Sequence, residues 1–387
     1  MPPLTTKKRS RVDLQERDLD IFETIYDLRF ATLNHLSALF PSTNQKLINP
    51  NAQFKAGQKA TANRISKLAR QKLGYYYLKR IGYPLRLVTQ PSVYTIDEKA
   101  ARVLADQRGY DLNDLLKQIK RNEKYFGTRS YKQFFLDHRL GINDFRVALI
   151  VALRQHQKSD WLRNENQIPY WIEPTTKDDQ KITVIPTRED IPTINNRLIA
   201  KPNHKLSRTP DATFLLKPDK TQDHTIAYIY EKDRGTERGR HPSNMATKLL
   251  CYFKWWQSKQ HHQLFGTKHL KVLVETETER RLKNMIEQSA LKINHGKGSK
   301  IFWFTTTDQI SLDNPTNLLN PIWIIGQQDE YDPEKSIRDQ HHHSLLEHTT
   351  KPWECPHSHA RPQRIVAIRV CYKKPSRARL RTPLPLP

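Results

Sequence analysis

Apolar residues near the start of the chain recur at helical spacing. Leu19, Phe22 and Ile25 fall on one face of residues 19–29, which predicts an amphipathic helix. The next predicted elements are a short helix, a polar loop, a third helix and two strands, over residues 33–40, 42–58, 60–73, 75–81 and 85–96.

Further along, two more helices are predicted over residues 97–107 and 111–125, and a long amphipathic helix over 131–156. Short apolar strands then alternate with helices. The predicted strands cover residues 170–173, 182–185, 211–216, 225–233, 270–276, 301–305 and 321–325, and the predicted helices cover 244–256 and 279–291. This alternation favours an α/β domain with a mixed sheet. The intervening residues 186–206 read as polar and irregular, and periodicity is lost from residue 327.

The charge is strongly basic and unevenly placed. Lys and Arg number 65 against 40 Asp and Glu, which gives a formal net charge of +25 and favours a polyanionic partner, nucleic acid before an acidic membrane surface. Between Asp27 and Asp97 there is no acidic residue, whereas the same stretch holds eleven Lys and Arg. A stretch of this kind indicates a face that meets phosphates.

The order of elements in this acid-free stretch is typical of a winged helix-turn-helix. In that fold the third helix enters the major groove and the hairpin touches the DNA backbone or minor groove. The expected DNA-contacting residues are Lys59, Arg64, Lys67, Arg70, Gln71, Lys79, Arg80 and Arg86. The alternatives are a winged helix used for protein contact and a helical bundle with a solvated basic face.

Several other classes of protein are disfavoured. The longest apolar run, residues 147–153, is too short to span a bilayer. Neither a P-loop nor a GxGxxG motif occurs, which disfavours ATPase and Rossmann assignments. Cys251, Cys355 and Cys371 are too few and too scattered for a disulfide framework, so we expect a protein of the reducing cytoplasm.

Carboxylates stand at the ends of two predicted strands. Asp211 begins one strand, while Glu231 and Asp233 end the next and share a face because they are two positions apart. If these strands pair, the three carboxylates converge and can hold Mg²⁺ or Mn²⁺, which would activate water for phosphodiester hydrolysis. Lys248 would then supply an ammonium group. The alternative is an ionic network in which the carboxylates pair with Arg234, Arg238 or Lys248.

This layout of helices and strands is similar to the PD-(D/E)xK nuclease fold, and residues 14–290 resemble the replication-relaxation proteins of bacterial plasmids and integrative elements. The resemblance rests on Arg17-Asp18, Arg29-Phe30, Leu33, residues 64–73, Val93-Tyr94, His138, residues 143–146, residues 210–212, residues 231–236, Lys248 and Tyr252. It implies a winged-helix DNA-binding protein serving plasmid replication or mobilisation. A nuclease of this fold carries Lys two positions after the strand carboxylate, where this chain has Asp233.

The expected fold class is therefore α+β, with a winged helix-turn-helix followed by a PD-(D/E)xK-like domain. The expected parts are a basic arm, the winged helix-turn-helix, a linker helix, the α/β domain and a mostly disordered basic tail, over residues 1–13, 14–110, 111–129, 130–326 and 327–387. The leading hypothesis is a sequence-directed binder of double-stranded DNA, with a degenerate nuclease-like domain and possible homodimerisation. The alternatives are an active Mg²⁺-dependent endonuclease and an adaptor that docks a relaxase or a replication initiator.

Overall fold

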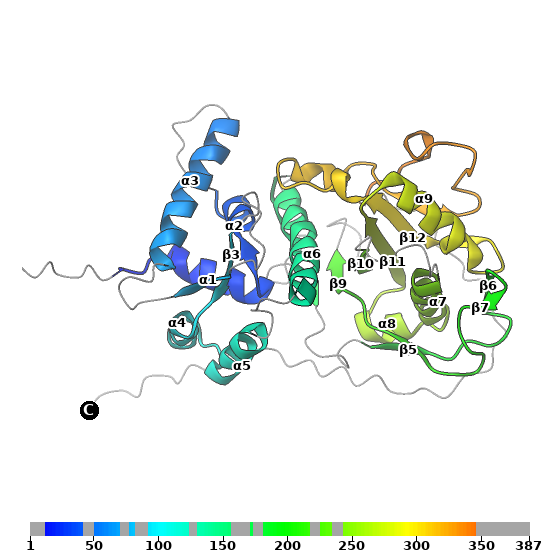
Figure 1. The fold of residues 1–387 in the computed structure, drawn as a ribbon, viewed down its shortest axis with the longest axis horizontal. Coiled ribbons are helices and arrows are strands. Elements are labelled where there is room, and N and C mark those ends of the chain that lie inside the picture. The colour runs from blue at the N-terminus through cyan, green and yellow to red at the C-terminus, as the bar shows by residue number, and fades with distance from the viewer. Residues whose placement is uncertain are drawn as a thin grey trace, which may run out of the picture. The chain divides into compact units, whose positions relative to one another are not determined.

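The computed structural model combines helices with several sheets, in agreement with the predicted α+β class (Figure 1). It describes residues 12–41, 50–69, 77–81, 92–123, 130–155, 171–172, 181–216, 225–233 and 243–345. The described residues form two compact units, the first reaching Asn143 and the second starting at Asp144. Within these ranges, no helix has the length and apolar character needed to cross a membrane.

The first unit contains short helices around a small sheet. Its elements are α1 (Glu16–Leu28), β1 (Ala31–Thr32), α2 (Leu33–Leu39), α3 (Pro50–Leu68), β2 (Leu78–Ile81), β3 (Val93–Ile96), α4 (Glu98–Arg108), α5 (Leu112–Glu123) and the first part of α6 (Ser130–Gln155). The sheet has the order β1-β3-β2, and both strand pairs are antiparallel. Apolar side chains of α1, α2 and α3, including Phe22, Leu36 and Ile65, are fully buried and form the core.

Helix α3 begins earlier than the sequence pattern indicates. The predicted loop over residues 42–58 is wrong for residues 50–58, which belong to the helix. Pro50 is the first helical residue, and proline suits this position because its φ is already helical and its missing N–H has no partner there. The polar composition that follows Pro50 conceals this first part of the helix.

The corner between α1 and β1 is held by side-chain amides from later elements. Arg29 has a φ of 64°, which turns the chain sharply after α1. Asn143 Nδ2 donates to the carbonyl oxygens of Leu28, at 3.1 Å, and Phe30, at 2.7 Å. Asn122, on the buried side of α5, donates to Arg29 O at 3.3 Å. Helix α5, expected as a linker, therefore packs into the first unit.

The second unit is built on a six-stranded mixed sheet. The described strands of the whole unit, including those outside the main sheet, are β4 (Trp171–Ile172), β5 (Ile182–Val184), β6 (Thr193–Ile194), β7 (Arg197–Leu198), β8 (Leu206–Arg208), β9 (Ala212–Leu216), β10 (Ile226–Lys232), β11 (His269–Thr276), β12 (Gly298–Thr306) and β13 (Ile324–Gln327). The main sheet has the order β13-β12-β11-β10-β9-β4. Strands β10, β11 and β12 run parallel, while β13, β9 and β4 join antiparallel, which confirms the predicted mixed sheet.

Helices lie on both faces of this sheet (Figure 1). The helices of this unit after β10 are α7 (Ser243–Gln257), α8 (Gln260–Phe265) and α9 (Glu279–Gln288), with short 3₁₀ turns after α9. Leu249 of α7 and Leu282 of α9 share one core with Ile229. On the other face, the ring of Phe145 from α6 stacks on Tyr230 with a centroid distance of 4.2 Å.

Helix α7 lies deep in this core. Trp255 is fully buried and Trp256 is nearly so, and both belong to the core of this unit. Cys251 is also buried, and its Sγ lies 3.6 Å from Ile182 O of β5 and 3.7 Å from Leu206 O of β8. The two-stranded sheet of β5 and β8 therefore packs on α7.

The described chain stays folded beyond residue 327. Residues 337–339 form a 3₁₀ turn, Trp323 and His343 exchange backbone hydrogen bonds, and Leu345 is fully buried. Tyr228 Oη donates to Leu345 O at 3.2 Å. The prediction of a mostly disordered tail is therefore wrong for residues 327–345, because irregularly spaced apolar side chains pack on the finished sheet. Residues 346–387 lie outside the described part of the chain.

Candidate functional site

The candidate site lies at the carboxyl end of β10, where charged side chains point to both faces of the sheet. Glu231 contacts α7, whereas Tyr230 faces α6 and Lys232 joins it on that side. This is the alternation that a strand imposes. Because Glu231 and Lys232 contribute to opposite faces, the end of β10 carries two separate ionic clusters.

The cluster on the α7 side is centred on Glu231, which is fully buried. Its Oε2 accepts a hydrogen bond from Lys248 Nζ at 2.5 Å, and its Oε1 accepts one from the Tyr252 hydroxyl. Burial raises the pKa of Glu231 to about 7; nearby Asp211 adds to this, while Lys248 and Tyr252 act in the opposite direction. The ion pair that the sequence offers as the alternative to a catalytic site is therefore present between Glu231 and Lys248.

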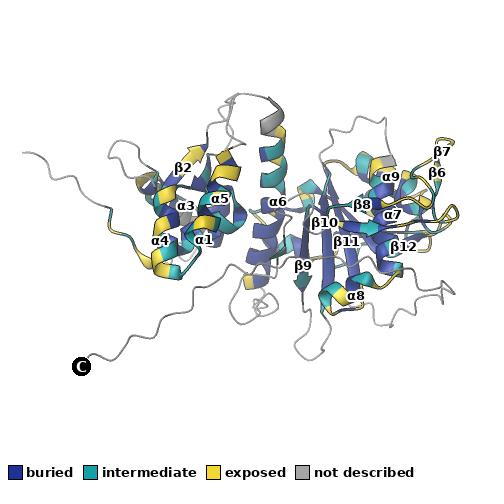
Figure 2. Cartoon of the chain, turned by 90° about the horizontal axis from the view of Figure 1, so that it is seen from below, coloured by how far each residue is buried: buried dark blue, intermediate teal, exposed yellow. Residues whose placement is uncertain are grey.

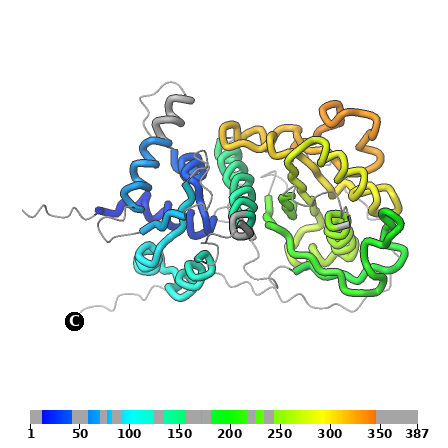
Figure 3. Tube along the Cα trace, in the orientation of Figure 1, coloured from blue at the N-terminus to red at the C-terminus, as the bar shows by residue number. Residues whose placement is uncertain are grey.

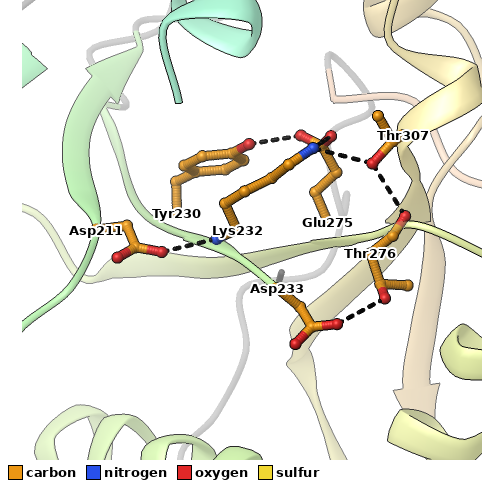
Figure 4. Close-up of polar contacts among 7 residues, drawn as sticks. All are labelled: Asp211, Tyr230, Lys232, Asp233, Glu275, Thr276 and Thr307. Atoms are coloured by element: carbon orange, nitrogen blue, oxygen red, sulfur yellow. Dashed lines mark hydrogen bonds and ion pairs between the residues drawn. The ribbon is translucent and has the colours of Figure 1, made fainter. Parts of the chain in front are cut away.

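The cluster on the α6 side is centred on Glu275 of β11, which is 2% exposed (Figure 4). Its carboxylate accepts from the Tyr230 hydroxyl at 2.5 Å and pairs with Lys232 Nζ. The same Nζ donates to Thr307 Oγ1 at 2.9 Å. Burial is the main cause that raises the pKa of Tyr230 well above its ordinary value, and the charge of Glu275 adds to it.

Asp211 and Asp233 lie near these two clusters, and each has hydrogen-bond partners of its own. Asp211 Oδ2 accepts from the backbone N–H of Lys232 at 2.9 Å (Figure 4). Asp233 accepts from Thr276 Oγ1 at 2.9 Å and from Arg281 Nη2 at 2.8 Å, and Arg281 Nε adds a second bond. The guanidinium of Arg281 therefore holds Asp233 by two donors, the geometry in which Arg binds carboxylates most strongly.

These carboxylates do not fit a divalent metal ion as they stand. Both oxygens of Glu231 and both oxygens of Asp233 already accept bonds from cationic or hydroxyl donors. Within the described part of the chain, no three His, Cys, Asp or Glu side chains gather closely enough to hold a metal ion. The roles predicted for Asp211, Glu231, Asp233 and Lys248 in catalysis, and for the three acids in binding Mg²⁺ or Mn²⁺, stay predictions.

The residues expected to contact DNA separate into two groups. Lys59 and Lys67 on α3, and Lys79 and Arg80 on β2, are exposed. Lys79 reaches Glu123 at 3.2 Å, and both side chains are about half exposed, so water screens this pair. Arg70, Gln71 and Arg86 lie outside the described residues.

Arg64 differs from the other predicted DNA contacts. Its Nε donates to Asp18 Oδ1 at 2.8 Å, its Nη2 pairs with Asp18 Oδ2, and Nη2 also donates to Asp13 O at 2.7 Å. Asp18 is completely buried. Arg64 is therefore only partly exposed: its charge neutralises a buried carboxylate and ties α3 to α1, and its contact with DNA stays a prediction.

Several residues of the site escaped the sequence analysis. Arg281, Glu275 and Thr307 lie 48, 43 and 75 positions from their partners on or just after β10. The parallel pairing of β10 with β11 places Lys232 opposite Glu275, and the parallel pairing of β11 with β12 brings Thr307 beside them. The one available signal was the placement of Glu275 at the end of an apolar strand.

The fold and the site define a two-unit α+β protein, in which a helical unit with exposed lysines precedes an α/β unit whose strand-end carboxylates are ion-paired. Residues 22–269, more than half of the chain, match the replication-relaxation family, and the chain belongs to this family. Its membership relates the protein to replication or mobilisation. Comparison with curated proteins and with solved structures gives no match.

Proposed function

We propose that this protein binds double-stranded DNA through its first unit, which is a winged helix-turn-helix. The element order α1-β1-α2-α3-β2-β3 and the antiparallel sheet β1-β3-β2 support this proposal. In this arrangement α3 is the helix that enters the major groove and the β2–β3 hairpin is the wing. We propose that this DNA binding serves the replication or mobilisation role that the family suggests.

The observation that carries this proposal is the exposed face of α3. Lys59, Asn63, Ser66 and Lys67 are exposed and share one side of the helix, because they follow at steps of three and four. Thr61, Ile65 and Leu68 are buried on the opposite side. No acidic residue occurs anywhere in α3. A helix with lysines and short hydrogen-bonding side chains on its open face is suited to phosphates and base edges.

Removing two lysines from α3 tests the proposal. We expect Lys59→Ala with Lys67→Ala to reduce the slope of log affinity against log salt by about 2, since each phosphate contact contributes about 0.9. The measurement is fluorescence anisotropy of a labelled duplex titrated with the full chain at several salt concentrations. The control is Lys117→Ala with Lys120→Ala, two exposed lysines of α5. Affinity independent of salt, or equal slopes for the two double variants, would exclude the proposed DNA-binding face.

We further propose that the second unit is a PD-(D/E)xK-like domain that no longer cleaves DNA. Leaving out β5–β8 and the short helix α8, the order is α6-β4-β9-β10-α7-β11; β9 is antiparallel to both β4 and β10, β10 is parallel to β11, and this agrees with that layout. The ion pairs of Glu231 with Lys248 and of Asp233 with Arg281 support the loss of cleavage. They occupy the carboxylates that a metal-dependent nuclease would need.

A supercoiled plasmid distinguishes this binding domain from an active nuclease. We expect no nicking by the wild type in Mg²⁺, Mn²⁺ or EDTA, and equal gel retardation of the plasmid by the wild type and Asp211→Ala. Agarose electrophoresis of the plasmid after removal of protein reports nicking, and the same samples run intact report binding. Metal-dependent nicking that disappears in Asp211→Ala would contradict the proposal and assign the carboxylates to catalysis.

A further inference from the structure

An ordered insertion joins β5 to β8 and contains the β6–β7 hairpin (Figure 3). The two residues of its turn, Asn195 and Asn196, have φ values of 51° and 58°. Positive φ at both central residues defines the tight hairpin turn whose twist matches that of the strands, and asparagine tolerates this conformation well. The hairpin is therefore a pre-shaped element, where the sequence pattern predicted an irregular segment.

The base of the insertion is fastened to the core of the second unit. Ile191 is buried in that core and Ile199 packs against it. Thr247 Oγ1 of α7 donates to Ile199 O at 3.2 Å, and Asn203 N donates to Pro186 O at 2.8 Å. The first bond ties the insertion to α7, the helix that also carries Lys248, and the second closes the base of the insertion.

The insertion is a second acid-free stretch of the chain. Residues 191–210 contain no Asp or Glu, whereas they contain Arg197, Lys201, Lys205 and Arg208. The first three are exposed. None of those three forms an ion pair with any residue that the structure describes, in contrast to the strand-end charges of the candidate site. Their positive charge is therefore available to a partner.

The tip of the hairpin is exposed on both faces (Figure 2). Arg197 and Leu198 are neighbours on β7 and so point to opposite sides of the ribbon, yet both are exposed, with Leu198 at 36%. Asn195, Asn196 and Thr193 add exposed hydrogen-bonding groups.

We propose that this basic hairpin insertion, residues 191–208, is a second DNA contact, through which the α/β unit grips backbone phosphates with Arg197, Lys201 and Lys205. The inference rests on the proposed function, because the partner is the duplex that the first unit binds. Arg, Lys, Asn and Thr are the side chains that make most phosphate contacts in protein–DNA interfaces. The absence of any carboxylate over twenty positions matches a partner of uniform negative charge. The surface of an acidic protein carries charges of both signs, so binding to it does not require a stretch without carboxylates.

The test compares two triple variants of the full chain in the salt titration of duplex binding. Arg197→Ala with Lys201→Ala and Lys205→Ala is expected to reduce the salt slope by about 2 to 3. The control, Lys268→Ala with Arg280→Ala and Lys292→Ala, removes one Arg and two Lys from exposed positions elsewhere in the same unit. We expect it to keep the wild-type slope. Circular dichroism and tryptophan fluorescence of both variants verify that the fold is retained.

The outcomes separate the two proposals. If the hairpin variant keeps the wild-type slope while Lys59→Ala with Lys67→Ala lowers it, the hairpin contact is excluded and binding by the first unit stands. If the wild type does not bind duplex DNA, both proposals fall. If the hairpin variant instead loses only retention on immobilised poly-glutamate, with duplex binding unchanged, the insertion recognises an acidic polypeptide and the DNA contact is overturned.

Discussion

Replacing Arg64 by Met is expected to lower the free energy of unfolding of the first unit by about 3 kcal/mol, because the buried carboxylate of Asp18 would lose its cationic partner. Methionine keeps the helix propensity of α3 and much of the aliphatic packing of arginine. The loss of the charge is therefore the main change. The backbone N–H of Gln15, 2.8 Å from Asp18 Oδ2, cannot compensate for a full positive charge.

Urea unfolding followed by two probes measures this effect in the intact chain. All seven tryptophans lie after residue 144, so tryptophan fluorescence reports the second unit, while circular dichroism also includes the helices of the first. We expect Arg64→Met to shift only the circular dichroism transition. Lys67→Met, an exposed position on the same helix, should change stability by less than about 0.5 kcal/mol. Equal stability of the two variants would show that the Asp18–Arg64 pair does not stabilise α3.

Replacing Lys248 by Met is expected to destabilise the second unit by less than about 1 kcal/mol at pH 5 and by about 1.4 kcal/mol more at pH 8, one unit above the Glu231 pKa of about 7. Burial raises the pKa of Glu231 to about 7, above its unfolded value of 4.5. The folded protein thus holds this proton more tightly than the unfolded chain, and stability falls as the pH rises from the unfolded to the folded pKa. Lys248 lowers the pKa of Glu231, so its removal raises that pKa further and extends the fall in stability to higher pH.

The transition in tryptophan fluorescence, measured in urea at pH 5, 6, 7 and 8, gives the pH dependence of this effect. Lys283→Met serves as the control, because its ion pair with Glu287 is partly exposed and contributes little at any of these pH values. A loss of stability in Lys248→Met that is equal at pH 5 and pH 8 would contradict the assignment of the pH effect to a buried Glu231.

The elements that follow local periodicity were predictable. Helix α7 and strands β9, β10 and β11 lie within two residues of their expected bounds, because long apolar runs leave few alternatives for them. The side of the sheet to which Glu231 points also follows from the alternation of the strand. These features depend on neighbours in sequence, and a single chain contains the information for them.

Features that depend on partners far apart in sequence were missed. Nothing in the sequence around Arg64 indicates that it pairs with the carboxylate of Asp18, 46 positions earlier. The β6–β7 hairpin consists of two-residue strands, too short for alternation to show, and only its Asn195-Asn196 turn marked it. The sequence of residues 327–345 shows no periodic pattern of apolar positions, because these side chains pack on the sheet formed by earlier strands and not on a regular element of their own.

The position of Cys251 has a practical consequence for spectroscopy. Its thiol is enclosed between α7 and the strands β5 and β8, and burial raises its pKa to about 12. Because thiol reagents attack the thiolate, maleimide dyes and spin labels will not modify Cys251 in the native protein at neutral pH. With Cys355 and Cys371 replaced by serine, labels attached to cysteines introduced on α3 or on the β6–β7 hairpin can therefore report each surface separately while the native Cys251 stays in place.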